Sequence, residues 1–66
     1  MEANTRLIES GYQWAVNEAL REGITAEQRE FWRGMATGLA TWTGGVIAPD
    51  RFEADSERMR FALTSR

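Results

Sequence analysis

Residues 34–49 read GMATGLATWTGGVIAP, sixteen consecutive residues without a charge, while the remaining fifty residues carry all eighteen charges of the chain. This stretch is too short and too rich in Thr and Gly to cross a bilayer, which takes about 20 mainly apolar residues. We therefore expect protein to cover it, either the core of this chain or a second chain. Such a stretch is a packing signal and not a catalytic one.

The length and composition indicate one small globular domain. At 66 residues, such a domain buries only about 60% of the surface that its unfolded chain exposes. Hydrophobic residues make up 42% and charged residues 27%, as in ordinary globular proteins. The chain has no Cys and no His, which excludes disulfides and the common structural zinc sites. Oligomerisation is the remaining way to stabilise so small a core.

The net charge indicates which classes of partner the chain is not suited to bind, nucleic acid in particular. A net charge of −2 and a pI near 5.0 argue against a general nucleic-acid binder, because contact with phosphates needs clustered positive charge. The N-terminal residues lack the basic, apolar and small-residue succession of a signal peptide. We therefore expect a cytoplasmic protein that does not enter a membrane.

A first helix is predicted over residues 4–22, where apolar residues recur at helical spacing. Asn4 or Thr5 could cap its start, and Gly23 could end it in the left-handed conformation. Its apolar arc is broad and contains Leu7, Ile8, Gly11, Tyr12, Trp14, Ala15, Val16, Ala19 and Leu20.

A second helix is predicted over residues 25–43. Thr25 followed by Gln28 forms a capping box, in which each side chain satisfies a backbone N–H of the other residue, and Gly44 with Gly45 stops the helix. One side of this helix is apolar and is expected to face the core. Its members are Phe31, Trp32, Met35, Leu39 and Trp42.

A third helix is predicted over residues 50–64, and Pro49 suits its first turn because the missing N–H costs nothing there. Either a hydrophobic staple or a capping box could mark its start. The residues concerned are Ala48, Ile47 and Phe52 for the staple, and Asp50 and Glu53 for the box.

The surface of the third helix alternates in charge. Arg51 and Asp55 sit at helical contact spacing, where an ion pair is worth a few tenths of a kcal/mol. We expect this face to be solvated. The apolar stripe of the helix is narrow, and Phe61 points away from it.

Short connections between helices of this length predict neighbours that pack against one another. The expected fold is therefore all-α, a compact three-helix unit of two long antiparallel helices and a shorter third. The apolar arc of the first helix is wider than one neighbour can cover, so we expect dimerisation to complete the unit. The predicted partner or dimer interface comprises Leu7, Gly11, Trp14, Val16, Leu20 and Phe61.

Small residues line both long helices. Gly11, Ala15 and Ala19 repeat every fourth residue on the first helix, and Gly34 and Gly38 do so on the second. This spacing could serve close packing within the monomer or a helix pair across a dimer.

The three tryptophans have two interpretations, because each could fill the core or anchor a partner, as Trp often does at binding hot spots. Trp14 lies at the edge of its helix's apolar arc and is the expected anchor. Trp32 and Trp42 are expected in the core.

The chain has few side chains suited to catalysis. His, Cys and Lys, which most often perform acid–base and nucleophilic steps at neutral pH, are all missing. The carboxylate pairs Glu18 with Glu22 and Glu53 with Glu57 each lie beside an Arg and indicate solvated surface. Gly44 and Gly45 lack the other residues of a phosphate-binding loop. We expect no enzyme, no metal and no cofactor.

We predict a non-catalytic helical interaction protein, a homodimer that binds and modulates or inhibits a larger protein. Small proteins of phages and mobile elements act in this way, an analogy that rests on size alone. One alternative is a structural subunit of a larger assembly or virion. Another is a helix-turn-helix-like DNA-binding protein that uses Arg51, Arg58 and Arg60, although Glu53, Asp55 and Glu57 on the same helix disfavour it.

Overall fold

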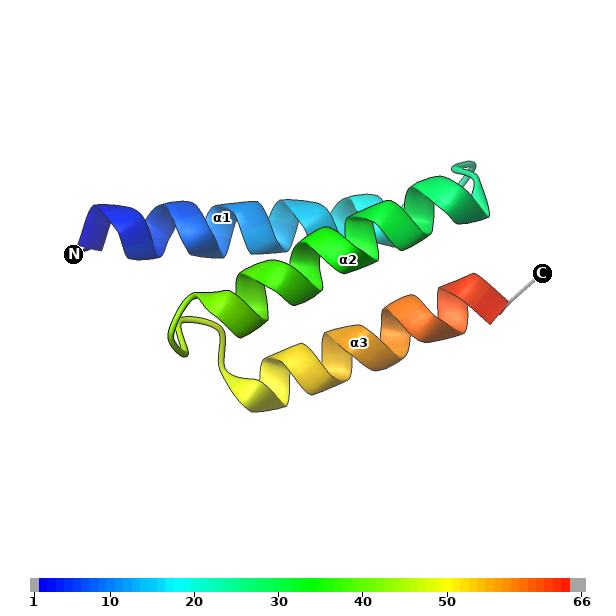
Figure 1. The fold of residues 1–66 in the computed structure, drawn as a ribbon. Helices are drawn as coiled ribbons and strands as arrows, with labels where there is room; N and C mark the ends of the chain where they lie inside the picture. Colours follow the sequence, from blue (N-terminus) through cyan, green and yellow to red (C-terminus); the bar gives the residue numbers. More distant parts are fainter. Residues whose placement is uncertain (1, 65–66) are drawn as a thin grey trace.

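The computed structural model describes residues 2–64, and over this range the chain forms three α-helices joined by two short connections (Figure 1). Helix α1 spans Glu2–Ala19, α2 spans Ala26–Trp42 and α3 spans Pro49–Thr64. The all-α, three-helix prediction is confirmed. The third helix, at 16 residues, is scarcely shorter than the other two, at 18 and 17.

Helix α1 begins and ends earlier than its apolar pattern predicts. It starts at Glu2, so Asn4 and Thr5 lie within it and do not cap it. It ends at Ala19, and Gly23 adopts the expected left-handed conformation (φ 87°) four residues later. The apolar pattern continues to Leu20 because that side chain still packs against the core from the turn.

A side chain of α2 donates hydrogen bonds to backbone carbonyls at the C-terminal end of α1. The Arg29 guanidinium donates through Nη1 to the carbonyl oxygen of Ala19 at 2.6 Å and to that of Arg21 at 3.3 Å. The last carbonyls of a helix have no partner within the helix, so a cationic donor placed there stabilises the terminus. This contact also fixes where α1 stops relative to α2.

Helix α2 has the predicted boundary signals. The Thr25 hydroxyl accepts from the Gln28 N–H at 3.0 Å, and the Thr25 N–H donates to Gln28 Oε1 at 3.0 Å. The helix ends at Trp42, and Gly44 and Gly45 both have positive φ, 69° and 85°. The capping box and the double-glycine stop are thus confirmed.

Helix α3 starts with the hydrophobic staple. Pro49 is its first residue, and the Phe52 N–H donates to the Ala48 carbonyl at 3.0 Å. Ile47 is buried and Phe52 packs against the same core, as the staple requires. Asp50 lies in the first turn and is not the cap.

The core between the helices is small. Helices α1 and α2 run antiparallel and make the main contact, while α3 packs on α2 and touches α1 less (Figure 1). Of the seven apolar residues that are buried in the described part of the chain, three are alanines, so the helices lie close together and enclose few large side chains. The core residues are Tyr12, Ala15, Val16 and Ala19 of α1, Ala36 of α2, Ile47 of the connection and Met59 of α3.

Candidate functional site

Large apolar side chains remain exposed on this small molecule. Over the described residues there are six of them, with exposed fractions from 45% for Met35 to 85% for Trp42. Single exposed apolar side chains are normal in monomers, whereas a group of them marks an interaction surface. The six are Leu7, Trp14, Phe31, Met35, Trp42 and Phe61.

Three of the six lie on one side of α2. Phe31, Met35 and Trp42 are spaced by four and seven residues, which places them on one face of a helix. Gly34 and Gly38 lie beside them, and a Cβ built on either glycine would meet no atom within 4 Å. We call these five residues the outer α2 face.

The sequence prediction was wrong about which side of α2 faces the core. Phe31, Met35 and Trp42 were expected to face the core with Trp32 and Leu39, yet only the last two pack against it. The reason lies on α1, where a Cβ built on Gly11 would lie 3.5 Å from Leu39 Cδ1. This is ordinary van der Waals contact, and together with the buried Ala15 and Ala36 it leaves the space between α1 and α2 filled without the three exposed large apolar side chains of α2.

An aromatic cluster connects α1 with the outer α2 face. The rings of Trp14 and Trp32 lie 6.1 Å apart at 32°, and those of Phe31 and Trp32 lie 5.1 Å apart at 77°, edge to face. Such arrangements are favourable for aromatic pairs. The Trp14 indole N–H donates to Glu18 Oε2 at 3.2 Å, which holds the ring on the surface of α1.

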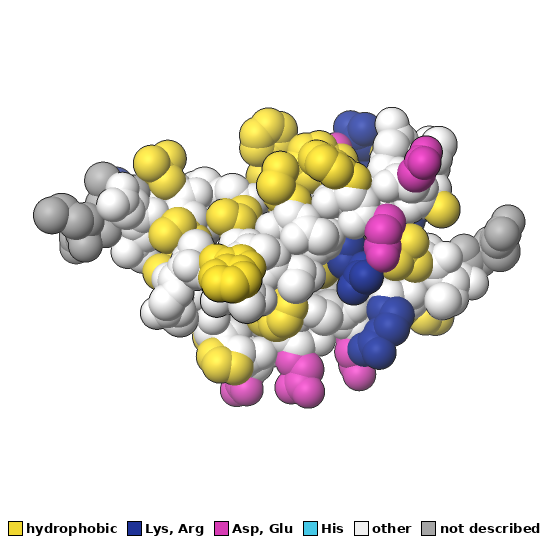
Figure 2. Space-filling view, viewed as in Figure 1, with side chains coloured by type: hydrophobic (Ala, Val, Ile, Leu, Met, Phe, Trp, Pro, Cys, Tyr) yellow, Lys and Arg dark blue, Asp and Glu magenta, His cyan; other side chains and the backbone are white. Residues whose placement is uncertain are grey.

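Exposed apolar residues cover much of α1 and α2. Figure 2 shows hydrophobic side chains spread over these two helices, with charged side chains along the outer edge of α3 and beside the hydrophobic ones at the end where α2 begins. We call the five exposed residues of α1 and α2 the apolar surface. They are Leu7, Trp14, Phe31, Met35 and Trp42.

The structure separates the six residues of the predicted interface. Leu7 and Trp14 are exposed and belong to the apolar surface, but Val16 is fully buried in the core and is unavailable to a partner. Gly11 faces Leu39 of α2, where an added Cβ would be in ordinary contact at 3.5 Å, so this position belongs to the contact between α1 and α2. That an interface exists at all stays a prediction.

The last two predicted interface residues lie together elsewhere. Leu20 is half-buried, and with the exposed Phe61 it lines a shallow depression between the α1–α2 connection and the end of α3. Arg21 and Arg29 lie on the rim of this depression. The predicted interface is therefore two separate surface regions.

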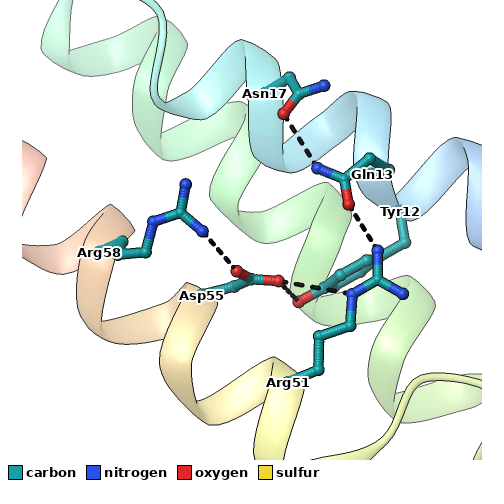
Figure 3. Close-up of polar contacts among 6 residues, drawn as sticks. All are labelled: Tyr12, Gln13, Asn17, Arg51, Asp55 and Arg58. Atoms are coloured by element: carbon teal, nitrogen blue, oxygen red, sulfur yellow. Dashed lines mark hydrogen bonds and ion pairs between the residues drawn. The ribbon is translucent and has the colours of Figure 1, made fainter.

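A buried carboxylate lies between α1 and α3, where the sequence predicted solvated surface. Asp55 is only 6% exposed. Its Oδ2 accepts from the Tyr12 hydroxyl at 2.7 Å, and its Oδ1 accepts from Arg58 Nη1 at 2.9 Å (Figure 3). The prediction was wrong for Asp55 because its partner Tyr12 comes from another helix, which the charge pattern of α3 cannot reveal.

Arg51 extends this contact along α1. Its Nε lies 3.9 Å from Asp55 Oδ2, its Nη2 donates to Gln13 Oε1 at 2.6 Å, and its guanidinium lies 5.0 Å from the centre of the Tyr12 ring. Gln13 in turn donates to Asn17 Oδ1 at 3.0 Å. The result is a polar network that joins α1 to α3 (Figure 3).

The network holds its tyrosine neutral. Burial raises the pKa of the Tyr12 hydroxyl well above its ordinary value, and the hydrogen bond to Asp55 raises it further. A phenol so placed donates a hydrogen bond but does not release its proton near neutral pH. We therefore assign Tyr12 and Asp55 to the packing of α3 against α1.

Residues 2–64 contain no group of three or more acidic, His or Cys side chains placed to hold a metal ion. Over the same range, none of the helices combines the length and the apolar character needed to cross a membrane. Comparison of the chain with known protein families, curated proteins and solved structures finds no match.

Proposed function

We propose that this chain is a non-catalytic interaction module that binds and modulates a larger protein through the apolar surface. The observation that carries the proposal is the exposure of large side chains on adjoining helices, above all Trp42 at 85%. Trp, Tyr and Arg dominate binding hot spots, and the apolar surface contains two tryptophans, Trp14 and Trp42.

The energetics of burial favour this role. Complete burial of one large apolar side chain contributes about 1.5 to 3 kcal/mol. Several buried together can offset the loss of translational and rotational freedom on association. The small core of this chain gives it little stability to spare, so an exposed surface of this kind is costly unless a partner covers it.

A second candidate is a structural subunit of a larger assembly. It is favoured by the position of Phe61, 72% exposed on α3 and outside the apolar surface. Two separate exposed apolar regions on one chain permit head-to-tail contacts between copies, which build rings or filaments. The DNA-binding alternative is weakened, because Arg51 and Arg58 contact Asp55.

Affinity capture from a lysate of the source organism tests the proposal. The bait is the full chain, compared with the Trp14→Lys variant and with Ala54→Lys as a matched control on the exposed side of α3. We expect the wild type and the Ala54→Lys control to retain the same protein and Trp14→Lys to lose it. Retention of the same set by all three baits would refute the proposal, and growth of the pure chain into large assemblies would favour the structural subunit.

A further inference from the structure

The outward side chains of α2 follow a coiled-coil spacing. Phe31, Met35, Gly38 and Trp42 are separated by four, three and four residues, as alternating d and a positions are. Coiled-coil seams normally lie between helices, yet here the buried part of α2 is on another side, at Ala36. Within residues 2–64 nothing packs into this seam at Gly34 or Gly38.

The seam has the same spacing in both directions, and this makes it complementary to a second copy. In an antiparallel pair related by a two-fold axis, Phe31 faces Trp42 of the second copy, and Met35 faces Gly38 of the second copy. The open space at Gly38 accepts the methionine side chain. A parallel pair would instead set Gly38 against Gly38, which leaves a gap, and Trp42 against Trp42.

The charges of α2 favour the same arrangement. All of them lie in its first half, at Glu27, Arg29, Glu30 and Arg33, and residues 34–42 carry none. An antiparallel pair places each charged half beside the uncharged half of the other helix and aligns the helix dipoles favourably. A parallel pair brings Glu27 and Glu30 close to their own copies, where like charges repel.

The chain exposes more surface than a compact monomer of its mass. It exposes 4902 Å², whereas a compact monomer of 7.5 kDa is expected to expose about 4,250 Å². The excess belongs to the whole elongated molecule, and the outer α2 face contributes three large apolar side chains to the exposed surface.

We infer that the outer α2 face binds a second copy of this chain, as an antiparallel helix pair with a two-fold axis between Met35 and Gly38. This inference rests on the proposed function, since it names the occupant of one part of the apolar surface. Leu7 and Trp14 on α1 are then left for the larger protein.

Disulfide trapping tests the arrangement, because the chain has no Cys of its own. An equimolar mixture of Phe31→Cys and Trp42→Cys chains is expected to form disulfide dimers, and neither variant alone is. In the antiparallel pair, identical positions 31 lie about 16 Å apart along the axis, beyond the ~7 Å between Cα atoms that a disulfide allows. Self-linking of each variant without linking in the mixture would overturn the inference, and Ala54→Cys is the control that should not link.

Sedimentation across micromolar concentrations supplies the second measurement. The wild type is expected to form a dimer of about 15 kDa, twice the 7.5 kDa chain. Trp42→Lys should raise the dimer dissociation constant at least tenfold with an unchanged circular dichroism spectrum, and Ala54→Lys should leave it unchanged. A wild type that stays monomeric overturns the antiparallel pair. If that monomer still captures a protein that Trp14→Lys loses, the proposed function stands without the pair, and if it does not, both fail.

Discussion

At the scale of single residues, Asp55 is the most consequential side chain of the core. A buried charge is costly unless it is paired and its oxygens are hydrogen-bonded. Here Tyr12 binds Oδ2, Arg58 binds Oδ1, and Arg51 lies beside Oδ2. Among the described residues, no buried side-chain oxygen or nitrogen lacks a hydrogen-bond partner. Asp55 therefore holds α3 in one position on α1.

Replacement of Asp55 by Asn is expected to lower the free energy of unfolding by about 2 kcal/mol, because hydrogen bonds to a charged group are lost inside the core. Glu53→Gln makes the same chemical change at an exposed position of the same helix and should alter stability by less than about 0.5 kcal/mol. Urea unfolding followed by circular dichroism measures both. Equal effects of the two substitutions would mean that Asp55 is not held as described.

Tyr12 predicts how stability changes at alkaline pH. Since its pKa is raised in the folded chain, the folded state holds the proton more tightly than the unfolded state. Its contribution is therefore complete below about pH 10, the ordinary pKa of tyrosine, and is lost as the pH rises above that value. Tyr12 is the only tyrosine, so tyrosinate absorbance reports it alone. We expect this absorbance to appear together with unfolding, whereas ionisation of a still folded chain would contradict the burial of the hydroxyl.

The polar network also shows what a sequence can reveal about single residues. Helical periodicity placed Tyr12 within the apolar arc of α1, which was right. It placed Asp55 with its charged neighbours, which was wrong, since α3 carries several acids at similar spacing. Only the tyrosine hydroxyl on another helix distinguishes Asp55 from the exposed Glu53, and that contact spans 43 residues.

At the scale of the helices, the contact of Arg29 with the end of α1 was not predicted. We expect Arg29→Ala to lower the free energy of unfolding by about 1.5 kcal/mol, because the carbonyls of Ala19 and Arg21 lose a charged donor. Hydrogen exchange of the amides in residues 20–24 should accelerate as well. Arg21→Ala is the matched control: its side chain is exposed and pairs with Glu18 at 3.5 Å, so its removal should cost less than about 0.5 kcal/mol.

Local signals located the helices well, but they did not orient α2. The capping box of α2 and the two glycines act through neighbouring residues and were predicted, whereas the start of α3 was left open between a staple and a capping box and the expected cap of α1 was wrong. The facing side of a helix depends on its neighbour, and the usual expectation is that the more apolar side turns inward. Here the small residues Gly11 and Ala15 of α1 bring α2 close, and small Ala36 takes the inward position while Trp42 points outward.

At the scale of the whole molecule, the proposed helix pair couples folding to association. Because only the folded chain forms the dimer, the melting temperature should rise by about 5 °C for each tenfold increase in protein concentration. Trp42→Lys should show this rise only at concentrations at least tenfold higher, and Ala54→Lys should behave as the wild type does. A wild type whose melting temperature is independent of concentration would contradict the pair. Calorimetry or circular dichroism at several concentrations measures the effect.

The long reach of the Tyr12–Asp55 bond has a consequence for the order of folding. Helices α1 and α2 are neighbours in the chain, and contacts close in sequence form quickly. The bond from Tyr12 to Asp55 spans 43 residues and must close a longer loop. We therefore expect α1 and α2 to pair first during refolding, with the tyrosine hydroxyl still hydrated, and the docking of α3 to bury it last.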